Sequence, residues 1–300
     1  MAENSIEIGV YLLTPTHLGS GQAAAAVDLP IIRESHTDYP LLPGTAIKGV
    51  LRQHASRTDP EITTTLFGTE PPQSGAPDTR ATNPGALVFT DGHLLAFPVR
   101  SLQAAFYWVT CPWVMERWIR QRKAVGLDAP ELQVSSLAPA ATFTPRNNAL
   151  VLENRLVEGV TEKEDLQAIG KEWSTLLPAN EPQLQERFQS HLVSVPDELF
   201  ADLVRRTTPV NARIQLTPGK TTDKWVDPDN GNKEYSGNLW YEETLPPDCL
   251  FSTLVTTRDG SDDPITGITL LFEEVTVAQI GGNETVGQGL ATWTMKGDVS

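Results

Sequence analysis

The chain has 300 residues, of which 39% are hydrophobic and 20% are charged, and its formal net charge at neutral pH is −15. This length is enough to bury a core, as one large domain or one domain with insertions. No stretch of about 18 apolar residues occurs, and the start MAENSIEIGV lacks a basic-then-apolar layout, so we expect neither a membrane span nor a secretion signal. Cys111 and Cys249 build neither a disulfide framework nor a metal site by themselves, which favours a cytoplasmic protein.

The negative net charge argues against a free-standing nucleic-acid-binding protein, because such proteins usually carry a basic balance. Two arrangements would still allow RNA binding: a basic face on an otherwise acidic surface, or an RNA shared among several copies and partner subunits. The basic residues that could form such a face are Arg33, Lys48, Arg52, Arg57, Arg117, Arg120, Arg122 and Lys123.

The first predicted elements are a strand, a glycine-rich loop and a helix. Residues 5–13 (SIEIGVYLL) are rich in β-formers and predict a central strand. Asp28 follows the loop, just before a proline, and residues 45–57 predict a helix that Thr45 caps. The loop contains His17, Gly19, Ser20 and Gly21.

Lys48 and Arg52 are four residues apart and therefore share one face of the predicted helix. These forty residues combine a loop of exposed amides, an imidazole, a carboxylate and two cations. Such a combination suits binding of a phosphate-rich polymer. The alternative is a plain turn after a strand, followed by a solvated helix face.

The next segments complete the predicted opening of the fold. Residues 58–84 are polar and rich in turn formers, which indicates a surface excursion. Residues 86–99 contain Asp91-Gly92 between two apolar runs, which predicts a β-hairpin. Strand, helix and hairpin together predict an α+β fold with a ferredoxin-like core of the RNA-recognition type. Residues 100–124 predict an aromatic helix broken at Pro112, whose aromatic side chains we assign to the core.

The middle and late segments predict two additions to this core. Residues 125–206 include amphipathic helices near 161–177, 182–192 and 197–206, and a strand near 149–156, and we interpret them as a helical insertion. Residues 210–216 and 238–245 resemble strands on either side of a long polar segment, which predicts a protruding hairpin over about 208–239. Trp225 lies in this polar segment and is interpreted as a contact residue.

A second glycine-rich segment, IGGNETVGQGL, precedes the predicted last strand, ATWTMK. Glycines at these spacings would let backbone amides approach a phosphate group. A plain turn before the strand is the alternative. The residues in question are Gly281, Gly282, Asn283, Gly287 and Gly289.

Several of these blocks, in this order, resemble the backbone subunit of the type III-B (Cmr) CRISPR effector complex, a member of the RAMP superfamily. The resembling blocks are THLGSG, VDLPIIRESHT, PGTAIKGVLR, FPVRSLQAAFYWVTCP, LWYEETLPPDCLF and IGGNETVGQGL. The resemblance implies a single RAMP domain over 1–300, with its core at about 1–110 and 240–300. It also implies that the hairpin acts as a thumb, which crosses a guide–target RNA duplex and displaces a base pair at regular intervals.

The resemblance further implies that the protein is a subunit of an antiviral ribonucleoprotein. Several copies of it would stack along CRISPR RNA, together with other Cmr subunits, and would cut complementary target RNA. The family's essential acid falls on Asp28, its loop histidine on His17, and its later acid on Glu242 with Glu243 beside it. An aromatic residue is common after these acids, whereas this chain has Thr244. The implied RNA contacts are Gly19, Ser20, Gly21, Arg33, Lys48, Arg52, Trp225, Gly281, Gly282, Asn283, Gly287 and Gly289.

These residue types suit cleavage of RNA by attack of its own 2′-hydroxyl on the adjacent phosphate. Histidine suits proton transfer at neutral pH, whereas a bare aspartate is a weak base and contributes better by holding Mg²⁺ or Mn²⁺. We therefore expect Asp28 to be the metal ligand and the isolated chain to be a poor nuclease. The alternatives are a non-catalytic RNA-binding filament subunit and an acidic scaffold that does not touch RNA.

Overall fold

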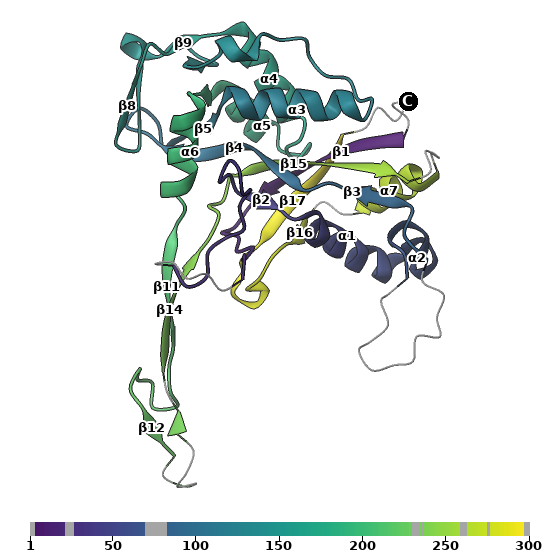
Figure 1. Cartoon of the computed structure of the whole chain (residues 1–300), viewed down its shortest axis with the longest axis vertical. Helices are drawn as coiled ribbons and strands as arrows, with labels where there is room; N and C mark the ends of the chain where they lie inside the picture. The colour runs from purple at the N-terminus through teal and green to yellow at the C-terminus, as the bar shows by residue number, and fades with distance from the viewer. Residues whose placement is uncertain are drawn as a thin grey trace.

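The computed structural model describes residues 4–21, 27–69, 83–227, 229, 234–235, 237–258, 263–274 and 277–296. A large mixed sheet crosses the body of the protein, helices cover both of its sides, and a long hairpin projects from the body (Figure 1). Within the described part of the chain, no helix is both long and apolar enough to cross a membrane.

The sheet is built around β1 (Ser5–Leu12), which is buried along its whole length and lies between β15 and β17. The strand order is β16-β17-β1-β15-β4-β5-β10-β6-β9, while β2 pairs with β4 and β3 pairs with β15. Neighbours are antiparallel except for the parallel pairs β5–β10 and β6–β9. The remaining strands of the sheet are β2 (Leu41–Leu42), β3 (Leu87–Phe89), β4 (Gly92–Arg100), β5 (Phe106–Thr110), β6 (Ala140–Ala141), β9 (Thr161–Glu162), β10 (Leu192–Ser194), β15 (Leu250–Thr257), β16 (Val277–Gln279) and β17 (Leu290–Lys296).

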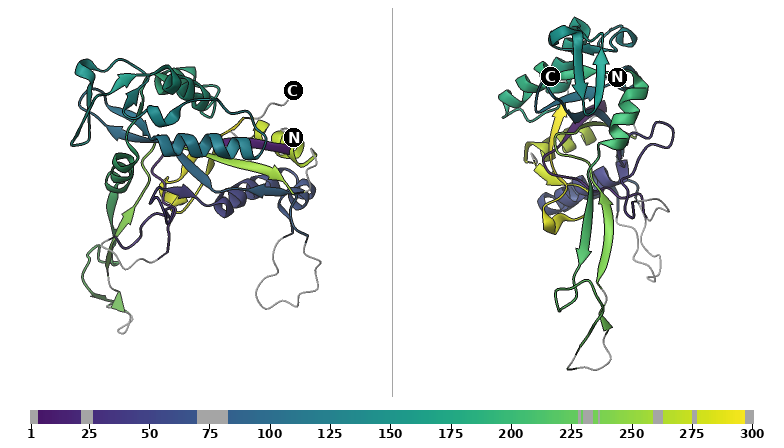
Figure 2. Two further views of the ribbon diagram at one scale, coloured as in Figure 1. Left: turned by 45° about the horizontal axis from the view of Figure 1, so that its top comes forward. Right: turned by 90° about the vertical axis from the view of Figure 1, so that its left-hand side faces the viewer.

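Helices lie on both sides of this sheet, which explains why both faces of β1 are buried (Figures 1 and 2). One side carries α1 (Gly44–Thr58), α2 (Pro60–Phe67) and α7 (Asp263–Glu274). The other side carries α3 (Pro112–Ala124), α4 (Glu164–Ser174) and α5 (Pro182–Ser190), and α6 (Asp197–Arg206) leads to the hairpin. In chain order the elements around β1 run β1, α1–α2, β3–β4, β15, α7 and β17. The predicted α+β class is confirmed.

The hairpin predicted at Asp91-Gly92 is wrong. Strands β3 and β4 do not pair with each other; both pair with β15, one beyond the other along the same edge. The break between them has a local cause, because the Asp91 carboxylate accepts a hydrogen bond from the Gly44 amide at the start of α1 (2.7 Å). Gly92 is closely packed, since an added Cβ would lie 3.1 Å from the Leu42 side chain. The predicted cap of α1 is also wrong: Pro43 holds that position and makes no side-chain hydrogen bond.

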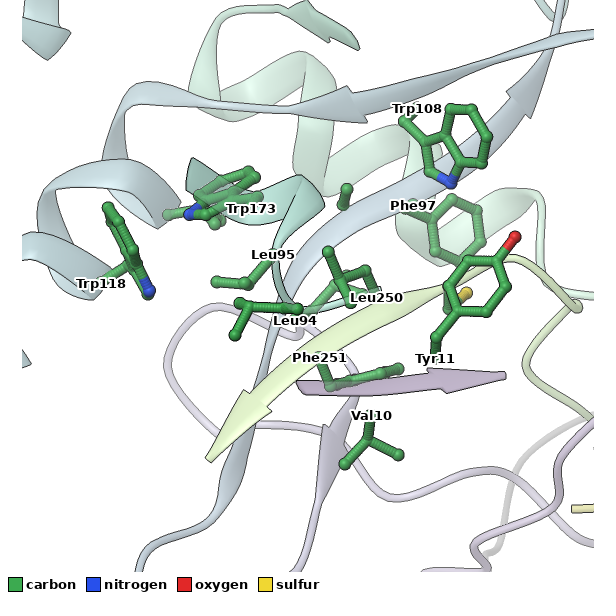
Figure 3. Close-up of a cluster of buried hydrophobic side chains, with 14 of the residues drawn as sticks. Val10, Tyr11, Leu94, Leu95, Phe97, Trp108, Trp118, Trp173, Leu250 and Phe251 are labelled. Carbon is green, nitrogen blue, oxygen red and sulfur yellow. The ribbon is translucent and has the colours of Figure 1, made fainter. Parts of the chain in front are cut away.

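Residues 100–124 form a strand and one helix rather than a broken helix. Phe106 to Thr110 make β5, and Pro112 is the first residue of α3, a position where its missing amide proton costs nothing. The assignment of the aromatic side chains to the core is confirmed for Trp108 and Trp118, which are 1% and 3% exposed. Figure 3 shows these rings with Trp173, Phe97 and Phe251 around β1 and β15. Burying each such side chain stabilises the fold by roughly 1.5–3 kcal/mol.

Residues 125–206 are not purely helical. They contain α4, α5 and α6 close to the predicted ranges, and the strand predicted near 149–156 is a hairpin of β7 (Ala149–Leu152) and β8 (Arg155–Glu158). Short 3-10 turns are found at Val134–Ser136 and Arg146–Asn148. Strands β6, β9 and β10 continue the main sheet into this region, so its packing is continuous with the rest of the body.

The projecting hairpin is built from β11 (Val210–Gln215) and β14 (Asn238–Glu243), with β12 (Trp225–Val226) and β13 (Glu234–Tyr235) paired farther out. Both figures show it extending well away from the body (Figures 1 and 2). The predicted strands on either side of a long polar segment are confirmed. The backbone of Trp225 belongs to β12, and its side chain lies outside the described part of the structure.

Two of the cations proposed for a basic face are buried in ion pairs instead. Arg122 pairs with Glu7 of β1, whose side chain is fully buried and also accepts a hydrogen bond from the Trp118 indole (2.6 Å). Arg117 donates to both carboxylate oxygens of Glu34, at 2.6 and 2.8 Å. Both cations belong to α3, on the opposite side of the sheet from α1 (Figure 1). A single basic face made from α1 and α3 is therefore excluded.

We predict that Glu34→Gln lowers the free energy of unfolding by about 3 kcal/mol at neutral pH, because it leaves a buried guanidinium without its charge partner. Burial alone would raise the pKa of Glu34, but hydrogen bonds from His93 and Thr37 and the charge of Arg117 lower it from 4.5 to about 2. The carboxylate's stabilisation is therefore complete above pH 4.5 and is lost as the pH falls toward 2.

Urea denaturation from pH 7 to acid checks this prediction, and the curves of the wild type and the variant should converge only as the pH falls to about 2, the pKa of Glu34 in the folded protein. The matched control is Glu153→Gln, which breaks an exposed pair with Arg100 and should cost less than about 1 kcal/mol. A difference between wild type and Glu34→Gln that is the same at all pH values would contradict the assignment.

Candidate active site and RNA interface

The two glycine-rich loops, residues 14–21 and 280–289, are in direct contact. The Gly282 amide donates to the carbonyl of His17 (2.9 Å), and the Gly289 amide donates to the carbonyl of Pro15 (2.9 Å). Thr16 exchanges backbone hydrogen bonds with Leu245, just after β14 (3.0 and 2.8 Å). Three segments that are far apart in sequence therefore meet at one end of β1.

Glycine is required at two positions of the second loop because the backbone is left-handed there and other backbone atoms lie very close. Gly281 has a φ of +89°, and a Cβ added to it would lie 2.4 Å from the His17 carbonyl oxygen. Gly289 has a φ of +81°, and its Cβ would lie 2.1 Å from the carbonyl oxygen of Ile280. The amides of Gly282, Gly287 and Gly289 all donate to carbonyl groups of the protein. The amides of Gly282 and Gly289 thus join the two loops, and the Gly287 amide closes a turn within its own loop, so these three amides are already engaged by protein carbonyls.

The first loop is more open. Gly19, Ser20 and Gly21 are exposed, and nothing lies within 4 Å of a Cβ added at Gly21. The Ser20 amide donates to the Pro30 carbonyl (3.1 Å), so this loop is held against the segment that carries Asp28. Exposed backbone and a hydroxyl at a fixed position suit contact with a sugar-phosphate chain.

Asp28 is exposed and lies between the first loop and the base of the hairpin. Its Oδ2 accepts a hydrogen bond from the Tyr241 amide of β14 (2.8 Å). The neighbouring residue, Leu29, donates to the Tyr241 carbonyl (3.1 Å) and accepts from the Glu243 amide (3.0 Å). The segment therefore runs beside β14 as a short parallel bridge, and β14 fixes the position of the carboxylate.

His17 has a defined tautomer. Its Nδ1 lies 2.8 Å from the carbonyl oxygen of Glu243, and because a carbonyl can only accept, Nδ1 must carry the proton. The neutral ring then presents Nε2 as an acceptor on the side of Gly19, whose added Cβ would lie 2.9 Å from that nitrogen. A half-exposed imidazole in this tautomer can take up a proton at Nε2.

Glu243 is buried and bound within the protein. Its Oε1 accepts from Arg33 (2.6 Å) and from the Thr208 hydroxyl (2.6 Å), and its Oε2 accepts from the Ile31 amide (3.1 Å). Arg33 also donates to the carbonyls of Asp38 (2.9 Å) and Val204 (3.2 Å). The side chain of Arg33 is only 14% exposed, so its guanidinium joins protein segments and is not free to bind a phosphate.

Glu242 points to the other face of β14 and is 3% exposed. Its Oε1 accepts from the side-chain Nδ2 of Asn283 in the second loop (2.7 Å), and its Oε2 lies 3.5 Å from Nε of Arg213 on β11. Asn283 has a left-handed backbone (φ 63°), which turns its side chain toward the hairpin. The two predicted acids therefore lie at the site, but their carboxylates are engaged by protein groups.

Lys48 and Arg52 lie on α1, as predicted, and both are half-exposed. One Arg52 nitrogen lies 3.4 Å from the Phe67 carbonyl at the end of α2, which holds the side chain across the pair of helices. Figure 1 shows α1 on the same side of the sheet as the base of the hairpin and the second loop. Their role as phosphate contacts stays a prediction, as does the contact role of Trp225.

Potential metal ligands are not gathered into one cluster in the described part of the chain. Among the described residues, no group of three or more His, Cys, Asp or Glu side chains is placed to hold a metal ion. Asp28 offers an exposed carboxylate that is fixed beside the first loop and the base of the hairpin. Such a single carboxylate suits Mg²⁺ bound mainly by phosphate oxygens and water, since Mg²⁺ is usually held by one or two carboxylates together with substrate phosphates.

Thr208, Arg213 and the Tyr241 amide also belong to this site and were not predicted from the sequence. A signal for Arg213 is present in the alternation of β11, where Asn211 and Arg213 share one face and apolar residues occupy the other. No local signal marks Thr208 or the Tyr241 amide, because their partners lie 35 and 213 residues away.

Comparison with known proteins agrees with this architecture. A sequence profile described as the RAMP superfamily matches residues 10–292. A Pyrococcus furiosus protein named CRISPR system Cmr endoribonuclease Cmr4 is 32% identical over 298 residues, which cover 96% of this chain and 95% of that protein. The crystal structure of oligomeric Cmr4 from Pyrococcus furiosus superposes with a TM-score of 0.73 at 26% identity, over 99% of each chain.

A chain from the cryo-EM structure of the type III-B Cmr-beta complex bound to cognate target RNA has the same fold. Its TM-score is 0.73 at 15% identity, over 97% of this chain and 96% of that one. The resemblance that the sequence motifs indicate is therefore confirmed over nearly the whole length. The chain belongs to the RAMP superfamily, among the relatives of Cmr4.

Proposed function

We propose that this protein is the backbone subunit of a type III-B Cmr effector complex, which binds CRISPR RNA and cuts complementary target RNA at regular intervals. The observation that carries the proposal is the exposed carboxylate of Asp28, which the Tyr241 amide fixes at the base of the hairpin and beside the first loop. The 32% identity to a protein named an endoribonuclease supports the same activity. Its partners would be CRISPR RNA, target RNA, further copies of itself and other Cmr subunits, in the cytoplasm.

We also propose a separate role for each region of the chain. The core at about 1–110 and 240–300 would carry the site, the region at about 125–206 would be an insertion, and the hairpin at about 208–239 would be the thumb. The length of β11 and β14 and their projection from the body support the thumb (Figure 2). A thumb that moves one nucleotide out of the duplex lets the backbone there reach in-line geometry for 2′-hydroxyl attack.

At that nucleotide, Asp28 and His17 would act on the reacting groups. His17 presents an unprotonated Nε2 in its neutral form, which suits it to accept the 2′-hydroxyl proton. Gly19, Ser20 and Gly21 would line the path of the RNA backbone, because they are exposed and fixed against the Asp28 segment. A bound Mg²⁺ or Mn²⁺ would neutralise charge developing on the phosphate, with Asp28 as its protein ligand.

We predict that Asp28→Asn abolishes target cleavage, by at least about 100-fold, while target binding is unchanged. Asparagine keeps an oxygen that can accept from the Tyr241 amide, so the fold of the site is preserved while the charge is removed. Gel analysis of labelled complementary RNA with the reconstituted complex checks this.

Asp128→Asn is the matched control for this experiment, because Asp128 is exposed and follows α3 on the other side of the sheet. Undiminished cutting by Asp28→Asn would overturn the catalytic assignment. Absence of cutting by the wild-type complex with normal target binding would instead support a non-catalytic filament subunit.

Removal of divalent metal ions is expected to stop cleavage without releasing the target. The physical reason is that a single carboxylate and a histidine leave the phosphate charge largely uncompensated. Incubation with a chelator, followed by addition of Mg²⁺ or Mn²⁺, checks this on the same gel. Cutting that persists in the chelator would show that the protein groups suffice.

Lys48→Glu is expected to weaken binding of the guide RNA. The slope of log K against log salt concentration is expected to become shallower by about one. The matched control is Lys123→Glu, an exposed lysine at the end of α3 on the opposite side of the sheet. Filter binding at several salt concentrations measures both. Equal affinities and slopes for the two variants would count against α1 as a phosphate contact.

A further inference from the structure

The base of the hairpin is held from both faces by two adjacent carboxylates. Glu242 and Glu243 are the last residues of β14, and neighbouring residues of a strand point to opposite faces. Their side chains are 3% and 7% exposed, and each contacts a segment remote in sequence. The hairpin therefore does not leave the body through a flexible joint at this strand.

On one face, Glu243 joins three segments. It accepts from Arg33 and from the Ile31 amide in the segment after Asp28, and from Thr208 at the start of the hairpin. Arg33 continues the connection to the end of α6 through the Val204 carbonyl (3.2 Å). The strand that enters the hairpin, the strand that leaves it and the Asp28 segment are thus bound through one carboxylate.

On the other face, Glu242 joins the hairpin to the second glycine-rich loop. It accepts from Asn283 of that loop (2.7 Å) and pairs with Arg213, which lies diagonally across from it on β11. The loop is in turn fixed to the first loop through the His17 carbonyl and the Gly282 amide (2.9 Å). Both loops and both strands therefore share a single network.

The same strand also places the reactive carboxylate. The Tyr241 amide donates to Asp28 Oδ2, and Leu29 forms backbone hydrogen bonds with Tyr241 and Glu243. Any rotation of β14 relative to the body would displace Asp28, because its hydrogen-bond donor is part of that strand. The direction of the hairpin and the position of Asp28 are geometrically coupled.

We propose that Glu242 and Glu243 are positioning residues that lock the direction of the hairpin to the position of the Asp28 carboxylate. They do not transfer protons, because their oxygens are used by Arg33, Thr208, Ile31, Asn283 and Arg213. This inference rests on the proposed function. In it, the rigid strand β14 determines the position at which the target RNA is cut. The nucleotide displaced by the hairpin and the acid beside it are held in register by the two carboxylates.

Hydrogen exchange of the full chain tests the coupling without using activity. Glu243→Gln removes the charge that holds Arg33, and we expect faster exchange in two regions together, residues 27–33 and residues 238–245. Glu153→Gln, in the exposed pair with Arg100, is the matched control and should leave both regions unchanged. Faster exchange in only one region, or in neither, would overturn the proposal.

Cleavage by the reconstituted complex provides the second test. We expect Glu243→Gln to lower kcat by about 100-fold with KM unchanged, because a misplacement of about 1 Å is enough for such a loss. The cuts should spread to neighbouring phosphates, and the pH profile of cleavage should keep its shape. A changed pH profile with sharp cuts and unchanged exchange would instead show that Glu243 transfers protons.

A third variant guards against loss of folding in Glu243→Gln. Asn283→Gly removes the contact with Glu242 but leaves both carboxylates in place, and glycine tolerates the left-handed backbone at this exposed position. We expect it to spread the cuts in the same way, with a smaller loss of rate. If the wild-type complex does not cut at all, the proposed function fails, and the exchange experiment still decides whether the hairpin and Asp28 are coupled.

Discussion

The antiparallel pairing of β1 with both β15 and β17 is the constraint on which the rest of the site depends. In an antiparallel pair, the end of one strand lies beside the beginning of its partner. The chain that leaves β1 at Leu12 therefore emerges between the segments that enter β15 and β17. These segments are β14 with its following turn and the second glycine-rich loop. Sheet topology thus gathers three remote pieces of sequence before any polar contact forms.

This arrangement also explains which features could be predicted from sequence. Helix α6 and the hairpin strands have strong local signals, namely acidic and basic ends in the helix and alternation beside a long polar segment in the strands. The hairpin predicted at Asp91-Gly92 does not form, because the pairing of β3 and β4 with β15, a strand about 160 residues later, outweighs the local turn signal. Residues 106–110 likewise became a strand because β4 and β10 offer pairing on either side.

The site itself was predictable in its residue types but not in their roles. His17, Asp28, Glu242 and Glu243 do meet, as the motif order indicated. Burial divides them, however, into an exposed acid with a half-exposed histidine and two enclosed carboxylates. A single sequence carries no trace of this division, because it depends on Arg33, Thr208, Arg213 and Asn283 arriving from other segments.

The placement of the charges bears on how an acidic chain would hold RNA. Arg33, Arg117 and Arg122 neutralise carboxylates inside the protein, so they add nothing to the potential outside it. With a net charge of −15, the cations left on the surface are outnumbered by acids. Counterion release from a single copy is then a weak source of affinity, since it scales with the number of phosphates neutralised. Under the proposed function, tight binding to a guide would therefore come from many copies acting along one RNA, and a rigid hairpin base would let each copy keep the same register as its neighbours.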